Sequence, residues 1–156
     1  VRFHCKIEPM RFILCAFLCI LHLVAQPQNI SNAQLDFENE LANAEKNKSV
    51  QDFNQAEVNF KRAIEIARQN NWKKLELNTS ISLAEYYRFR AQFAVGLDLL
   101  YSLKGVEVYP DLHIRMLGRI AAIQHERYDL PIDLQLDSVQ FFLDSAIMLS
   151  EWFFGV

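Results

Sequence analysis

The sequence predicts an all-α protein built of about three tandem helical hairpins after an N-terminal leader. Apolar residues recur at the spacing of one helix face in six separate segments, for example at Ala56, Phe60 and Ala63. No segment alternates apolar and polar residues for long enough to predict a strand. The apolar pattern also repeats along the chain, which indicates stacked copies of one helical unit.

Length and composition are those of one small domain. The chain has 156 residues, of which 51% are hydrophobic, and this is enough to build a core. The formal net charge is −3, so the sequence offers no basic footprint for nucleic acid. We expect no nucleic-acid partner for this segment.

A continuous apolar run at residues 12–25 follows a methionine and an arginine. It is shorter than the roughly 20 residues that cross a bilayer, and its length and basic flank are typical of a secretory signal. We expect residues 10–25 to be a signal peptide and residues 26–30 a polar spacer. Residues 1–9 are then an extension upstream of the true start at Met10.

The cysteines support export without disulfides. Cys5, Cys15 and Cys19 all lie in or before the leader, so the expected mature chain has none. A lipoprotein leader is the alternative, but a large apolar residue precedes both leader cysteines where lipidation favours a small one. A mature domain of this kind must be held together by packing alone.

The first expected hairpin joins helices at residues 31–49 and 52–69. Ser31 or Asn32 can cap the first helix, and Asp52 opens the second. A polar tract separates the two helices, as expected for a turn.

The second expected hairpin joins helices at residues 72–88 and 93–103. The break at residues 90–92 is short, so the second helix must fold back antiparallel to the first. Gly105 ends this hairpin as a residue suited to the left-handed conformation. We expect residues 106–109 to be an extended connection.

The third expected hairpin joins helices at residues 110–125 and 134–152. Pro110 suits a first helical turn, and Asp111 complements the positive helix end. A longer break at residues 128–133 separates the two helices.

The second helices of the hairpins share one apolar pattern. A large residue is followed by a small one, a second large one, and a small or medium one, at an offset of 40 residues and then of 43. Because one hairpin cannot bury its apolar faces alone, such copies must stack. The alternative is an ordinary helical bundle core. The three copies are Phe53, Ala56, Phe60 and Ala63; Phe93, Gly96, Leu100 and Leu103; and Leu136, Val139, Leu143 and Ala146.

This pattern resembles the tetratricopeptide repeat family in its longer-period variant. The first hairpin matches the family's second helix at all four positions. Leu83, Ala84 and Tyr87 match the family's first helix. The third hairpin matches less well, because Ala121 fits but Gln124 stands in place of the aromatic residue.

The resemblance implies an α-α superhelix over residues 31–152, in which the first helices of the hairpins line a concave face. That face would bind a protein or peptide, with Asn78, Arg88 and Arg115 clamping its backbone or a carboxylate. The alternative is that these are exposed polar positions. The candidate groove residues are Asn78, Glu85, Arg88, Arg115, Arg119 and His125.

A second resemblance concerns context. The leader, the repeats and the segments 119–123 and 136–139 are similar to the periplasmic front ends of membrane-bound sensor histidine kinases and related helix-turn-helix regulators. This implies an exported, extracytoplasmic sensory part of a longer membrane-anchored signalling protein. The apolar end at residues 152–154 would then continue beyond Val156, and membrane contact would come only through the leader or a downstream helix. The alternatives are a standalone periplasmic or secreted adaptor, or the N-terminal module of an envelope enzyme.

Nothing in the sequence predicts catalysis, a cofactor or a metal site. His113 and His125 are twelve residues apart on one expected helix, whereas helical metal ligands favour a spacing of four. There is no Gly-x-Ser-x-Gly motif and no glycine-rich phosphate loop. We expect a non-catalytic binding module.

Two glycines lie inside expected helices. Gly96 stands where the repeat pattern has alanine, at a cost of about 1 kcal/mol in helix propensity. We expect Ala84 and Gly118 to be close-contact positions between helices.

Overall fold

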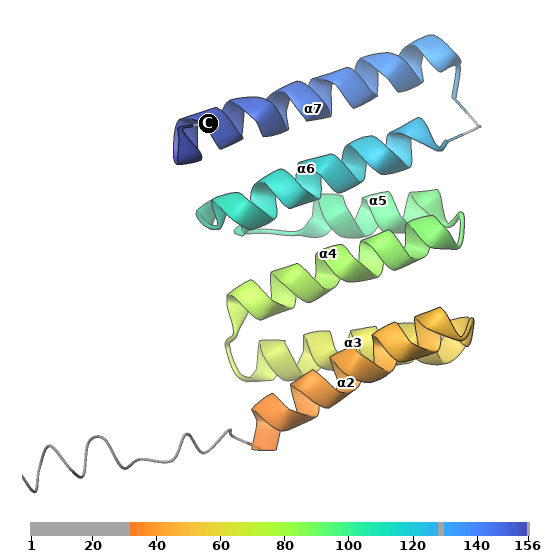
Figure 1. Ribbon diagram of the computed structural model, residues 1–156, viewed down its shortest axis with the longest axis vertical. Coiled ribbons are helices and arrows are strands. Elements are labelled where there is room, and N and C mark those ends of the chain that lie inside the picture. Colours follow the sequence, from red (N-terminus) through yellow and green to blue (C-terminus); the bar gives the residue numbers. More distant parts are fainter. Residues whose placement is uncertain (1–31, 128–129, 156) are drawn as a thin grey trace, which may run out of the picture. The chain divides into compact units, whose positions relative to one another are not determined.

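The computed structural model describes residues 32–127 and 130–155, which form helices joined by short turns (Figure 1). These residues contain no strand, so the all-α prediction is confirmed. The expected extension, leader and spacer at residues 1–30 lie outside the described residues. The elements are α2 (Asn32–Ser49), α3 (Phe53–Gln69), α4 (Lys73–Phe89), α5 (Phe93–Ser102), the 3-10 helix η1 (Val106–Val108), α6 (Pro110–His125) and α7 (Ile132–Phe154).

The first three turns share one conformation, and it recurs every 20 residues. Gln51, Asn71 and Ala91 each adopt a left-handed backbone, with φ of 61°, 57° and 53°. The next residue donates its N–H to a carbonyl five residues earlier, at 2.9 Å in all three turns. This is the bond that closes a Schellman motif. A helix and its turn therefore occupy 20 residues and a hairpin 40, which explains the first repeat offset.

Each helix packs against the next along the chain, except that α5 reaches α6 through η1. In addition, α6 packs on both α4 and α5 (Figure 1). Helix α4 lies at the centre, because it contributes to the apolar cluster shared with α2 and α3 and to the one shared with α5 and α6. Phe60 and Tyr87, which the repeat pattern places inside, are 0% and 6% exposed.

The repeat pattern holds in the first two hairpins and fails in the third. Ala56 and Ala63 are fully buried in α3, and Gly96 and Leu100 are buried in α5. The expected third copy is wrong at its two leucines, because Leu136 and Leu143 of α7 are 51% and 42% exposed.

Helix α7 turns a different side to the core. Gln135 is buried and Phe142 packs against the core cluster, one position earlier than the pattern predicts. Of the described helices only α6 makes an extensive contact with α7. The longer connection before α7 frees it from the 20-residue rhythm that fixes the register of the earlier helices.

Gly96 is the close-contact glycine, and the expectation for Gly118 is wrong. A Cβ added at Gly96 would lie 3.1 Å from Ile123 Cδ1 and 3.2 Å from the Ala84 carbonyl oxygen. The Ala84 side chain is itself fully buried, as expected for a close-contact position. A Cβ added at Gly118 would meet nothing within 4 Å. Helix α5 thus approaches α4 and α6 at Gly96, which accounts for a glycine inside a helix.

The connection before α6 also differs from the expectation. Residues Val106–Val108 form a 3-10 helix rather than an extended segment. Gly105 turns the chain with φ of 81°, as its type predicts, and Val106 is then buried in the core cluster. Pro110 occupies the first turn of α6, as expected.

Candidate functional site

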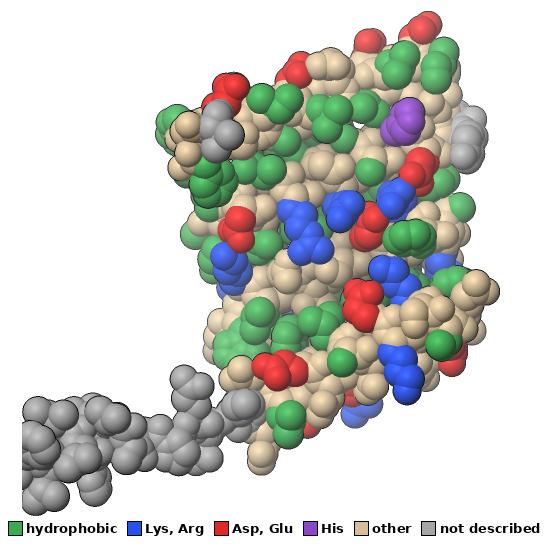
Figure 2. Space-filling model, viewed as in Figure 1, with side chains coloured by type: hydrophobic (Ala, Val, Ile, Leu, Met, Phe, Trp, Pro, Cys, Tyr) green, Lys and Arg blue, Asp and Glu red, His purple; other side chains and the backbone are tan. Residues whose placement is uncertain are grey.

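The six candidate groove residues lie on α4 and α6, and five of them take part in two polar networks that join these helices. The exception is His125, which is exposed in the last turn of α6. Figure 2 shows this face, with Lys and Arg side chains gathered across the middle of the domain and acidic side chains beside them.

The first network is centred on Arg115 of α6. Its guanidinium donates to the Asn78 side-chain oxygen and, at 3.1 Å, to Ser82 Oγ, both on α4. All three side chains are partly buried. Arg115 is therefore already engaged by the neighbouring helix.

The second network is centred on Glu85 of α4. Arg88 pairs with Glu85 at 2.7 Å and also with Glu126, which follows α6. Arg119 Nε lies 3.5 Å from Glu85 Oε2, an ion pair without hydrogen-bond geometry. Burial opposes ionisation of Glu85, but the Arg88 hydrogen bond and the nearby positive charges outweigh it, so the pKa of Glu85 is lowered.

These contacts give the predicted arginines a structural task. A peptide carboxylate on this face would have to compete with Glu85 and Glu126 for Arg88. Partly buried charge pairs of this kind are costly to break, because one partner is left without its counterion. The α4–α6 face is thus better suited to holding two hairpins together than to clamping a ligand.

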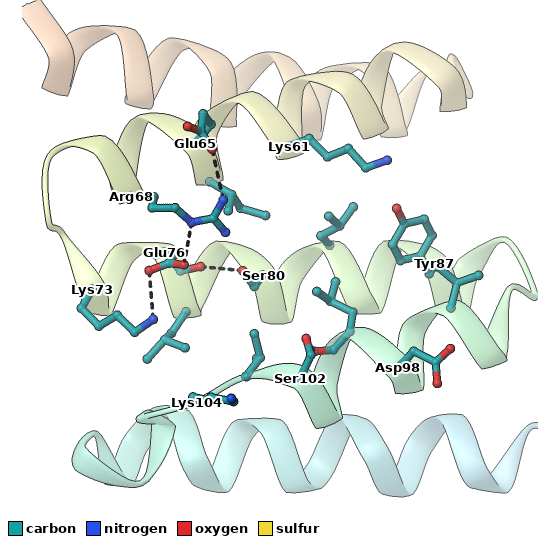
Figure 3. A pocket seen from close by; sticks show the side chains of 16 residues that line it. Lys61, Glu65, Arg68, Lys73, Glu76, Ser80, Tyr87, Asp98, Ser102 and Lys104 are labelled. Atoms are coloured by element: carbon teal, nitrogen blue, oxygen red, sulfur yellow. Dashed lines mark hydrogen bonds and ion pairs between the residues drawn. The ribbon is translucent and has the colours of Figure 1, made fainter.

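The opposite side of α4 forms the floor of a groove with a volume of about 770 Å³. Its walls come from α3 and from α5 with the residues that follow it (Figure 3). Ligand pockets in proteins commonly have volumes of this size. The apolar part of the lining consists of Ile64, Leu77, Leu83, Val95, Leu99 and Leu103.

The rim at one end of this groove is charged and largely paired. Arg68 contacts Glu65 at 3.1 Å and Glu76 at 3.3 Å, and Lys73 contacts Glu76 at 3.0 Å. Lys104 lies near the same end as Lys73 (Figure 3) and is exposed. Among the described residues it has no ion-pair partner, so its ammonium group is available to a ligand.

The other end carries a hydroxyl and a carboxylate. Tyr87 donates from its hydroxyl to Glu57 at 2.9 Å, and Lys61 pairs with Glu57 at 2.7 Å. The Lys61 hydrogen bond is the largest influence on Glu57 and, despite partial burial, the pKa of Glu57 is lowered. Asp98 lies near this end (Figure 3) and forms no ion pair with any other described residue. The groove therefore offers an unpaired cation at one end and an unpaired carboxylate at the other.

Sequence reasoning missed this groove because it followed the first helices of the hairpins. The groove is lined instead by the second helices, α3 and α5, with the far side of α4 as the floor. A signal was present in α3, where Lys61, Glu65 and Arg68 fall at i, i+4 and i+7 and so share one face.

The described residues show no centre for chemistry. Within 32–127 and 130–155, no group of three or more His, Cys, Asp or Glu side chains is placed to hold a metal ion. None of the helices in that part of the chain combines the length and the apolar character needed to span a bilayer.

Comparison with known proteins returned no match: no protein-family model, no curated protein and no solved structure is significantly similar to this chain. The geometry of the described helices is therefore the basis of the functional argument.

Proposed function

We propose that this chain is a non-catalytic helical-repeat domain that binds a protein or peptide in the groove formed by α3, α4 and α5. The observation that carries the proposal is the apolar floor of that groove with Lys104 and Asp98 unpaired at its two ends. Hydrophobic lining with a few convergent polar groups is the usual composition of a binding site.

The two ends suit a directional ligand. An extended or helical peptide can place apolar side chains on the floor while a carboxylate meets Lys104 and an amide or ammonium group meets Asp98. Because the two ends carry opposite charge, one orientation of the peptide is favoured over the reverse.

A peptide-display selection against the chain tests the proposal. Peptides that bind the wild type are measured against Ser102→Trp, which adds bulk to an exposed position in the groove lining, and against Asn43→Trp, which adds bulk to an exposed position on α2 outside it. We expect Ser102→Trp to weaken binding at least about tenfold and Asn43→Trp to leave it unchanged.

A charge pair sharpens the test. Lys104→Glu should weaken acidic peptides, whereas Lys46→Glu, at an exposed position outside the groove, should not. Selected peptides that bind Ser102→Trp as well as wild type, or a selection that yields no binder of the folded chain, would contradict the proposal.

We also propose that this domain is the extracytoplasmic sensory part of a longer membrane-anchored signalling protein. The support lies in the apolar run at residues 12–25 and in the resemblance to periplasmic sensor regions. A fusion of the chain from Met10 to alkaline phosphatase, which folds only after export, should be active in a bacterial host. Deletion of residues 10–25 should abolish that activity, and an equally active deletion would contradict the assignment.

A further inference from the structure

Helix α7 exposes an unusual amount of apolar surface. It runs for 23 residues, and Gln135 is the only one of them that is buried. Trp152 is 77% exposed, and Phe141 and Met148 are each 65% exposed. Patches of this kind on a domain surface indicate an interaction site.

The exposed residues follow two stripes along α7. At 100° per residue, one stripe lies on each flank of the side that packs against the core. Hydrophobic side chains also cover much of the visible surface of α7 in Figure 2. The first stripe consists of Ile132, Leu136, Leu143 and Ile147, and the second of Leu134, Phe141, Met148 and Trp152.

The charge on α7 has a single sign. Between the two stripes runs an acidic ridge, and the helix contains no Lys, Arg or His at all. None of these carboxylates forms an ion pair with another described residue. The ridge consists of Asp133, Asp137, Asp144 and Glu151.

We propose that α7 is the docking surface for an amphipathic α-helix of another protein, one whose apolar stripe is edged by Lys and Arg. The apolar flanks supply the contact area, and the unpaired ridge selects the charge of the helix that packs beside it. A second copy of this chain is disfavoured on the same face, because it would bring acidic ridge near acidic ridge. None of the groove-lining residues belongs to α7, so this surface is distinct from the groove.

Two synthetic helical peptides test the charge rule. Both carry the same leucine stripe; one has lysine and the other glutamate at the stripe edges. We expect the lysine peptide to bind the whole chain at least about tenfold more tightly than the glutamate peptide, and to weaken as salt is raised.

A charge swap assigns the effect to α7. The double variant Asp137→Lys/Asp144→Lys alters two exposed positions and should reverse the peptide preference. The matched variant Asp36→Lys/Glu38→Lys alters two exposed positions on α2 and should leave it unchanged. Circular dichroism of both variants checks that their helix content is unaltered.

An apolar variant and the groove variant complete the test. Phe141→Asp/Met148→Asp should weaken both peptides, while Ser102→Trp should weaken neither, which separates this site from the groove. Equal binding of the two peptides, or an unchanged preference in the charge swap, would overturn the proposal. So would a wild-type dimer that Phe141→Asp/Met148→Asp dissolves, or cosedimentation with neutral lipid vesicles that this variant abolishes.

Discussion

Replacing each of the two helix-interior glycines with alanine separates helix propensity from close packing. Alanine is favoured over glycine inside a helix by about 1 kcal/mol. At Gly118 the new methyl group meets nothing within 4 Å, so only this gain applies. We therefore expect Gly118→Ala to raise the free energy of unfolding by about 1 kcal/mol.

At Gly96 the same gain is opposed by contact. The new Cβ would lie 3.2 Å from the Ala84 carbonyl oxygen and 3.1 Å from Cδ1 of Ile123, which is fully buried. A backbone oxygen cannot turn aside as a side chain can, and overpacking of this kind costs about 1 to 3 kcal/mol. We expect Gly96→Ala to lower the free energy of unfolding by about 1 kcal/mol on balance.

Denaturant unfolding of both variants measures the contrast. The two should differ by about 2 kcal/mol, which corresponds to several degrees in Tm. Because the substitution is the same and both sites lie inside helices, the difference reports the approach of α5 to its neighbours. A Gly96→Ala variant as stable as Gly118→Ala would refute that close approach.

Three further predictions concern caps and charge. Ala91→Gly should raise the free energy of unfolding by about 1 kcal/mol, because Ala91 has φ of 53°, whereas Ala94→Gly in the following helix should lower it by a similar amount in thermal melts. Asp52→Ala should cost about 1 kcal/mol in urea unfolding, because the Asp52 side chain caps α3 by accepting from the Gln55 N–H at 3.3 Å. The lowered pKa of Glu85 means that its contribution is present above the ordinary value of 4.5 and is lost as the pH falls through the folded value; Glu85→Gln should therefore show a shallower loss of stability below about pH 4.5, and an unchanged slope would contradict this reading.

Much of the fold follows from local sequence. The 20-residue rhythm of helix and turn follows from short-range apolar spacing and from the cap at Asp52. The left-handed turns at Gln51 and Ala91 were not predictable from residue type, because neither residue favours that conformation. Tertiary packing of the flanking helices imposes it.

Long-range contacts set the limit for the candidate site. Sequence spacing placed Arg88 and Arg115 on faces that meet, but it could not show that Glu126, 38 residues after Arg88, already pairs with it. Lys104 and Asp98 belong to no sequence motif, and only the packing of α3 and α5 on α4 brings them to one groove. The predicted register of α7 was wrong for a related reason, since its longer connection is not constrained by local pattern.

Backbone amide exchange, measured helix by helix, tests most directly the claim that stacked hairpins shelter one another. Helix α4 packs against α3, α5 and α6, whereas among the described helices α7 is packed extensively only by α6. The account predicts slowest exchange in α4 and fastest exchange in α7, with α3 and α6 between them. Exchange in α7 as slow as in α4, or uniformly fast exchange in all helices, would contradict it.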